Sequence, residues 1–236
     1  MKYEMPARIR FSEVDQHGKL TLFHLINYFQ DASTFHGEDV GRGTAWTSER
    51  GVAWVVAGWQ LHIRRFPLMS EKVVVRTWPY SFRGFIGARN YTMETEDGEL
   101  LAAADSEWVL MDMNKNIPTR VEKGLLEVFG SEEKFQDDFG ARKIAMEGTG
   151  EEQEHFTIQE YQLDTNHHVN NGQYICMAEK YLEEGFVPVH FRAEYKKQAY
   201  LGDEIVPKVC KVEGGVQIAL ENTEGEAYFT AEFLNH

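Results

Sequence analysis

The sequence predicts an α+β fold made of two tandem units, each with an antiparallel sheet wrapped around a central helix. Three observations predict it. Two blocks of sequence occur twice, each copy contains one helical pattern, and several strand-like runs follow each helical pattern. The 236 residues are 42% hydrophobic, which is enough apolar material for two cores in domains of about 100 residues each.

The two repeated blocks occur in the same order. RIRFSEVDQHGKL (8–20) resembles TIQEYQLDTNHHV (157–169), and Asp15 lies over Asp164 at an offset of 164 − 15 = 149 residues. LHIRRFPLMSEKVVV (61–75) resembles AEYKKQAYLGDEIVP (193–207), and Glu71 lies over Asp203 at an offset of 203 − 71 = 132. The difference, 149 − 132 = 17 residues, indicates an insertion in the first copy, around GEDVGRGTAWTSERG. Two blocks in one order indicate a duplicated unit.

Each copy is predicted to contain a short strand, a helix and an antiparallel meander. In the first copy the helix is apolar on nearly all sides around 22–29, as in a helix that a sheet encloses. In the second copy apolar residues recur on one helix face, at Tyr174, Ile175, Ala178, Tyr181 and Leu182. Strand-like runs follow at 52–63, 71–78, 85–95 and 101–111, and again at 188–196, 204–213, 216–221 and 226–234. This arrangement is a double hotdog.

The predicted boundaries follow from these patterns. We expect an N-terminal hotdog over 1–118 and a C-terminal hotdog over 156–236. The polar, acidic stretch 119–155 between them is expected to be a linker with one short helix near 121–129.

Composition excludes several classes of partner. The net charge of -14 makes nucleic acid and anionic membranes poor partners. No run approaches the roughly 18 apolar residues of a membrane span, and MKYEMPARIRF at the start has no signal or transit pattern. We therefore expect a soluble, cytoplasmic protein without a cofactor. Cys176 and Cys210 form no CxxC pair and are expected to be structural thiols.

One polar run, LDTNHHVNNGQY (163–174), stands directly ahead of the second helix. Asp and Asn favour turns and helix caps, so the run could serve that purpose alone. The first copy, however, forms its turn with EVDQHGKL, which contains neither an Asn-x-His pair nor an Asn-Asn pair. The run therefore holds more polar groups than a turn requires, which indicates a functional site. The His167-His168 doublet lacks the i, i+4 spacing of metal ligands on a helix, so no metal is expected.

Nearly the whole chain resembles the acyl-ACP thioesterase family. DTNHHVNN (164–171) and EYKKQAYLGD (194–203) carry the resemblance in the second half. RIRFSEVDQHGKLTLFHLINYFQDA, WQLHIRRFPLMSEKVVVRTWPYSFRGF and DGELLAAADSEWVLMDMNKNIPTR carry it in the first. The resemblance implies hydrolysis of the thioester between a fatty acyl chain and the phosphopantetheine arm of acyl carrier protein, in fatty acid biosynthesis.

The family's Asp-x-Asn-x-His motif falls on Asp164, Asn166 and His168. Plant members have a Glu-Cys pair after a basic pair, whereas here Gln198 and Ala199 follow the basic pair. The chain therefore offers neither a cysteine nucleophile nor a second carboxylate at that place. It also lacks a plastid transit peptide, so it resembles the bacterial type.

The residues of the motif suit direct attack by water. His168, with an ordinary pKa near 6.5, can move a proton at neutral pH, and Asp164 can orient it or act as the base. Gln198 can only position a group. The backbone N–H groups of Val169 and Asn170, at the start of the helix, are the expected oxyanion hole.

The first half is expected to have lost chemistry, because Phe66 stands where the second half has Gln198. Asp15 and His17 are then relics, and this half takes the acyl chain. Its candidate substrate contacts are Phe23, Trp54 and Trp59. The expected partner is acyl carrier protein, and the chain is a monomeric pseudo-dimer or a homodimer. Two alternatives stay open: an acyl-CoA thioesterase on the same fold, and a non-catalytic acyl-binding module.

Overall fold

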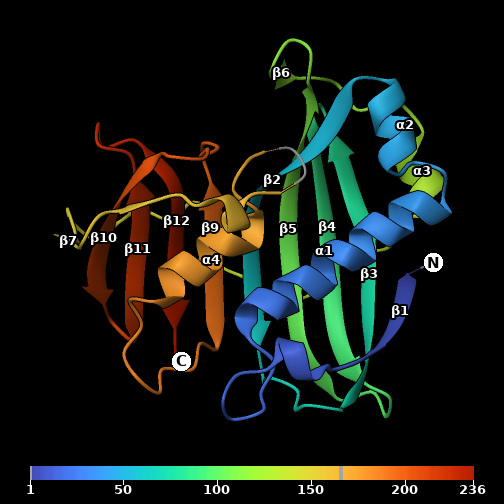
Figure 1. The fold of residues 1–236 in the computed structure, drawn as a ribbon. Coiled ribbons are helices and arrows are strands. Elements are labelled where there is room, and N and C mark those ends of the chain that lie inside the picture. The colour runs from blue at the N-terminus through green and yellow to red at the C-terminus, as the bar shows by residue number, and fades with distance from the viewer. Residues whose placement is uncertain (1, 165–166) are drawn as a thin grey trace. The chain divides into compact units, whose positions relative to one another are not determined.

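The chain forms two compact units in a computed structural model that describes residues 2–164 and 167–236. Unit 1 comprises Met1–Ala57 and His62–Phe139, and unit 2 comprises Gly58–Leu61 and Gly140–His236. In each unit a helix crosses one face of an antiparallel sheet, as Figure 1 shows. The predicted α+β double hotdog is confirmed.

Unit 1 holds the longer helix and the longer strands. Its elements are β1 (Tyr3–Arg8), α1 (Leu22–Asp39), α2 (Thr44–Glu49), β2 (Val52–Ile63), β3 (Lys72–Arg83), β4 (Ile86–Thr95), β5 (Leu100–Asp112), β6 (Ile117–Pro118) and α3 (Leu125–Phe129). The strands lie in the order β1-β3-β4-β5-β2, with β6 paired to β5. The predicted run 52–63 coincides with β2, and the insertion of the first copy contains the end of α1 and the short helix α2.

Helix α1 begins at a polar cap and buries one stripe against the sheet. The hydroxyl of Thr21 accepts the His24 N–H and so caps the first turn. The Phe29 ring packs on Tyr91 of β4, with 5.2 Å between ring centroids. On the other side Phe35 remains 47% exposed. Over 22–29 no residue is exposed, as expected of a helix that a sheet encloses, and exposed residues begin only at Asp31.

Unit 2 repeats this plan with a shorter helix. Its elements are β7 (Glu151–Glu152), β8 (Phe156–Thr157), α4 (Asn171–Glu179), β9 (His190–Tyr195), β10 (Glu204–Val212), β11 (Gly215–Glu221) and β12 (Ala227–Leu234). The strands lie in the order β9-β12-β11-β10-β7, with β8 paired to β10. The Tyr174 ring of α4 stacks on Phe229 of β12 at 5.4 Å. Because α4 ends at Glu179, Tyr181 and Leu182 lie in the turn that follows and not on the predicted helix.

The hydrogen bonds of unit 1 recur in unit 2 at the two predicted offsets. Equivalent residues of the first block differ by 149 in residue number, and those of the second block differ by 132. The recurring pairs are Ile9 N–H to Glu71 O and Ile158 N–H to Asp203 O, Leu20 N–H to Pro67 O and Val169 N–H to Ala199 O, and Thr21 N–H to Glu13 O and Asn170 N–H to Gln162 O. The duplication inferred from the sequence is thus also a duplication of backbone geometry.

The stretch 119–155, predicted to be a linker, packs on both units, and the division between them falls after Phe139. On unit 1, the Trp78 indole donates to the Glu133 carbonyl at 2.9 Å. On unit 2, Arg192 donates to the Ala141 carbonyl at 2.6 Å. The stretch is therefore a covering segment of each sheet. The predicted short helix near 121–129 is α3.

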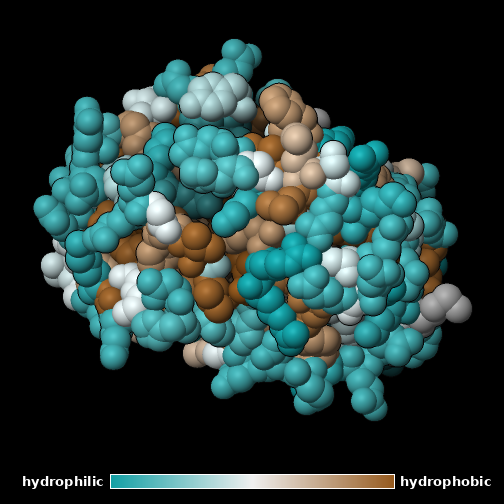
Figure 2. Space-filling model, turned by 90° about the horizontal axis from the view of Figure 1, so that it is seen from below, coloured by the Kyte–Doolittle hydropathy of each residue, from teal (hydrophilic) through white to brown (hydrophobic). Residues whose placement is uncertain are grey.

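The described part of the chain contains no helix that is long and apolar enough to cross a membrane. Figure 2 shows mostly hydrophilic side chains on the face seen from below, with hydrophobic side chains in smaller patches between them. This surface agrees with the excess of acidic residues in the sequence.

In the turn before each helix, a residue at the equivalent position adopts the left-handed region. In unit 1 it is Gly18, with φ of 72°, and in unit 2 the equivalent residue is His167, with φ of 62°. Glycine adopts this region without a steric penalty, whereas a residue with a side chain pays on the order of 1 kcal/mol. Unit 2 therefore keeps the turn at a cost that unit 1 avoids.

We predict that His167→Gly raises the free energy of unfolding by about 1 kcal/mol, because it removes this strain. Gly18→Ala is the matched control in unit 1 and should lower stability by a similar amount. A Cβ at Gly18 would meet no atom within 4 Å, so only the backbone conformation can contribute there. Urea denaturation of both variants measures the effect. A destabilised His167→Gly would show that the imidazole makes contacts that outweigh the strain.

Candidate functional site

The candidate site lies in unit 2, at the turn that leads into α4. Leu163 and Val169 form an isolated antiparallel bridge, and the Asp164 N–H donates to the His168 carbonyl at 2.8 Å. The turn therefore holds two of the three predicted motif residues, Asp164 and His168, at its two ends. The third, Asn166, lies outside the described residues.

Asp164 has a structural role that unit 1 shares. Its Oδ1 accepts the backbone N–H of His168 at 3.4 Å. In unit 1 the Oδ1 of Asp15 accepts the equivalent N–H, that of Lys19, at 2.9 Å. A carboxylate at this place thus closes the turn in both units. Asp15, which was expected to be a relic of a site, therefore stabilises the turn of unit 1.

The turn can form without a histidine at residue 168, since unit 1 has Lys19 at the equivalent position. The imidazole is half-buried and meets the edge of the Tyr200 ring, with 4.9 Å between centroids and 85° between ring planes. This contact restricts the orientation of the imidazole. The neighbouring His167 is exposed, as expected of a solvated side chain.

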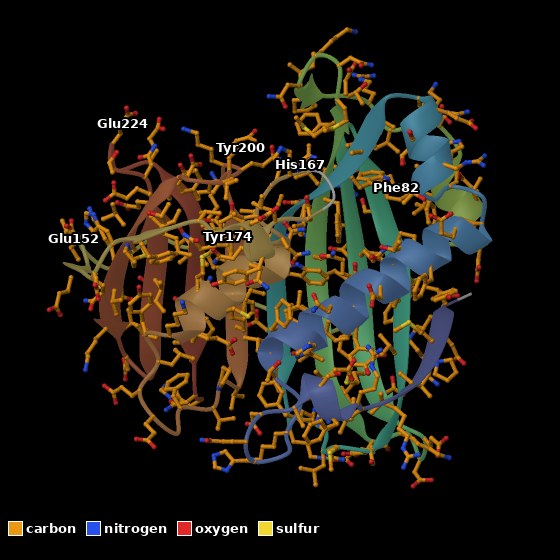
Figure 3. All side chains as sticks on the ribbon, in the orientation of Figure 1. Phe82, Glu152, His167, Tyr174, Tyr200 and Glu224 are labelled. Carbon is orange, nitrogen blue, oxygen red and sulfur yellow. The ribbon has the colours of Figure 1, made fainter. Side chains whose placement is uncertain are left out.

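The segment after β9 is attached to the turn through Ala199. The Ala199 carbonyl accepts the Val169 N–H at 3.0 Å, and the Ala199 N–H donates to the Tyr174 hydroxyl at 2.8 Å. Figure 3 shows Tyr174 on α4 and Tyr200 on this segment. Both bonds bring the half-buried Gln198 next to the motif. Within residues 2–164 and 167–236, the Gln198 carboxamide makes no hydrogen bond, so it can bind a water or a substrate oxygen.

The expected oxyanion hole needs correction. The Val169 N–H donates to Ala199, and the Asn170 N–H donates to the Gln162 carbonyl at 2.9 Å. Unit 1 makes the same two bonds, so they belong to the shared scaffold. The N-terminus of α4 does offer another donor. Asn170 caps the Gly172 N–H with its side chain at 2.9 Å, while the Asn171 N–H makes no hydrogen bond to the described residues.

Neither cysteine is a nucleophile in this structure. Burial, with a smaller contribution from Glu179, raises the pKa of the Cys176 thiol to about 12, so the thiol stays protonated at neutral pH. The Cys210 thiol donates to the Glu147 carbonyl. Among the described side chains, no group of three or more His, Cys, Asp and Glu is arranged to hold a metal ion.

The three predicted substrate contacts differ in burial and in their neighbours. Phe23 is half-buried, with its ring 4.8 Å from that of His24. Trp54, also half-buried, stacks on Phe82 in unit 1 at 5.5 Å. Trp59, which belongs to unit 2, is only 1% exposed, and such burial is typical of a core residue.

Tyr174 is a site residue that the sequence pattern did not reveal, because it fits the apolar helix face. In unit 1 the equivalent residues of Tyr174 and Ala199 are Leu25 and Pro67. A proline has no N–H, so unit 1 needs no hydroxyl at residue 25. Because Ala199 has an N–H where unit 1 has a proline, its combination with Tyr174 was the signal in the sequence for this hydrogen bond.

Two units with this fold, the second of which has Asp164 and His168 at the two ends of the turn before its helix, define a double hotdog protein. The family model described as the acyl-ACP thioesterase N-terminal domain matches residues 1–129. The C-terminal domain model of the same family matches residues 146–232. The chain belongs to the acyl-ACP thioesterase family.

Curated relatives include plant enzymes. The acyl-[acyl-carrier-protein] hydrolase FATB3 of Cuphea viscosissima is 26% identical over 257 residues, which cover 95% of this chain and 62% of that protein. A palmitoyl-acyl carrier protein thioesterase of Gossypium hirsutum is 27% identical over 181 residues, which cover 71% and 44%. The chain thus spans less than two thirds of the length of these relatives.

Solved structures show the same fold over nearly the full chain. An acyl-ACP thioesterase from Bacteroides thetaiotaomicron has a TM-score of 0.91 at 21% identity, covering 99% of this chain and 97% of that one. The 12:0-ACP thioesterase from Umbellularia californica has a TM-score of 0.85 at 20% identity, covering 99% and 96%.

We predict that Tyr174→Phe lowers the free energy of unfolding by about 1–2 kcal/mol, because the buried N–H of Ala199 loses its acceptor. The double variant Tyr174→Leu with Ala199→Pro copies unit 1 and should recover most of this loss. Urea denaturation of Tyr174→Leu, Ala199→Pro and the double variant, beside wild type, forms a thermodynamic cycle. Equal stability of wild type and Tyr174→Phe would show that the hydroxyl does not support the segment.

Proposed function

We propose that the chain hydrolyses the thioester of a fatty acyl chain on acyl carrier protein, releasing a free fatty acid and the carrier protein. One observation carries the proposal: equivalent hydrogen bonds close the turns of both units, yet unit 2 has His168 in place of Lys19. Family membership and relatives named as acyl-carrier-protein hydrolases support the same reaction. The reaction belongs in fatty acid biosynthesis, and we place it in the cytoplasm.

In the proposed mechanism His168 acts as general base and then as general acid. The imidazole takes a proton from water while the water oxygen bonds to the thioester carbonyl carbon. The carbon–sulfur bond then breaks, and the imidazolium returns the proton to the departing phosphopantetheine sulfur. The carboxylate of Asp164, at the other end of the turn, orients the imidazole or acts as the base itself. Asn166 remains a candidate for holding the water.

The developing oxyanion requires donors other than those first expected. We propose the Gln198 carboxamide and the Asn171 N–H, since neither donates to another described residue. The N-terminus of α4 adds the positive end of the helix dipole. No acyl-enzyme forms in this mechanism, because Gln198 and Ala199 hold the places of the Glu-Cys pair and the Cys176 thiol is protonated.

The carrier decides between the proposal and its alternatives. We predict a higher kcat/KM for an acyl chain on acyl carrier protein than for the same chain on CoA, measured by release of the free thiol. Equal or faster turnover of the CoA ester would make the chain an acyl-CoA thioesterase. No turnover with either carrier would leave a non-catalytic acyl-binding module.

Side-chain roles are separated by isosteric variants. We predict that His168→Gln lowers kcat by roughly 10²–10⁴-fold, the usual contribution of a general acid–base. Asp164→Asn keeps an oxygen that can close the turn and should still reduce kcat, because the charge is lost. Asp15→Asn, its counterpart in unit 1, is the control and should leave the rate unchanged. A wild-type rate in Asp164→Asn would show that Asp164 serves only the turn. Trapping an acyl-enzyme in a single-turnover experiment would exclude direct attack by water.

A further inference from the structure

Unit 1 encloses one cation that has no carboxylate beside it. Arg89 of β4 is 7% exposed, and burial lowers the pKa of its guanidinium. Among the described residues no carboxylate oxygen lies within 4.0 Å of it. Arg192 of β9 provides a comparison. Its guanidinium bonds the nearly buried carboxylate of Glu232 at 2.8 Å. Arg89 thus differs from an ordinary buried ion pair.

The protein satisfies only part of the Arg89 guanidinium. Its Nη1 donates to the Nδ1 of His36 at 3.2 Å and to the Thr77 hydroxyl at 3.1 Å. The Phe129 ring lies 5.3 Å from the guanidinium carbon. The Nε and Nη2 groups, which carry three more N–H donors, make no hydrogen bond to the described residues. A forked pair of donors therefore remains, and this geometry matches a carboxylate.

The shared scaffold does not require a cation at this position. In unit 1 Arg89 is paired with Pro79, and in unit 2 Val216 is paired with Lys211. Since Pro79 and Lys211 are equivalent at the established offset, 211 − 79 = 132, the counterpart of Arg89 is Val216. Val216 is 7% exposed, as Arg89 is. One fold therefore accepts an apolar side chain here, and a desolvated guanidinium is a cost that unit 1 alone carries.

The surroundings of Arg89 are aromatic. Gly87 precedes it by two residues, and so lies on the same face of β4. A Cβ at Gly87 would meet Phe82 at 2.7 Å and Trp54 at 3.1 Å, so both rings lie directly on the backbone there. The Phe82 ring in turn contacts Phe129 at 6.0 Å, and Figure 3 labels Phe82 in unit 1. The rings form an apolar wall that ends at the guanidinium.

We propose that Arg89 is the anion-binding residue of a site in unit 1 that takes an amphipathic carboxylate, a free fatty acid. The carboxylate binds the Nε and Nη2 groups as a forked pair, and the chain lies against Trp54, Phe82 and Phe129. The identity of the acid rests on the proposed function, since a fatty acid is the product of that reaction. A product bound in unit 1 would compete with the acyl chain for the same aromatic wall.

The test measures binding without turnover. Sodium dodecanoate, methyl dodecanoate and sodium acetate are titrated into the protein, and tryptophan fluorescence and calorimetry report binding. Dodecanoate should bind wild type at least about 10-fold more tightly than the methyl ester, which has the chain without the charge. Acetate, which has the charge without the chain, should bind far more weakly than dodecanoate. Equal affinities of acid and ester would overturn the proposal.

Variants locate the charge. Arg89→Met should weaken dodecanoate binding at least about 10-fold and leave the ester unaffected. It should also raise the melting temperature by a few degrees, because an unpaired buried charge is removed. Arg192→Met is the control, and should lower the melting temperature because Glu232 loses its partner. Unchanged dodecanoate binding or a lower melting temperature in Arg89→Met would assign Arg89 to the fold instead. These results are obtained whether or not the chain hydrolyses acyl carrier protein.

Discussion

The candidate site depends on the two hydrogen bonds of Ala199. Its carbonyl binds the turn at Val169, and its N–H binds the Tyr174 hydroxyl on α4. One residue thus joins the turn, the helix and the segment after β9, which are far apart in the sequence. Without this junction His168 would lose the Tyr200 ring that restricts it, and Gln198 would have no fixed place beside the motif. Since a buried N–H needs an acceptor, the tyrosine follows from the absence of a proline at residue 199.

Comparison of the units separates what the scaffold needs from what the site adds. Unit 1 forms the same turn with Asp15, Gly18 and Lys19, and the same junction with Leu25 and Pro67. Closing the turn therefore explains Asp164 but not His168. The shared scaffold also explains why the N–H groups of Val169 and Asn170 are occupied, because their counterparts in unit 1 make the same bonds.

Much of the fold could be predicted because local apolar periodicity and the internal repeat determine it. The run 52–63 became β2, and the offsets of 149 and 132 reappeared in the hydrogen bonds. The early end of α4 could not be predicted, since Tyr181 and Leu182 continue the apolar spacing beyond the point where the helix stops. The occupied N–H groups were missed for a different reason. A helix start shows which donors lack a partner within the helix, but the carbonyls that satisfy them come from Gln162 and Ala199, and only the tertiary fold brings these near.

The two units depart from their common scaffold in different ways, and each departure has a cost. Unit 2 holds His167 in a left-handed conformation that glycine would adopt more easily. Unit 1 buries Arg89 where unit 2 has Val216, and crowds two rings onto Gly87. Neither cost is needed to form a sheet around a helix, because in each case the other unit forms the same structure without it. Strain and a desolvated charge are therefore the features by which a duplicated fold shows where function was added. This argument supports both proposals, hydrolytic chemistry in the second copy and recognition of the chain and its carboxylate in the first.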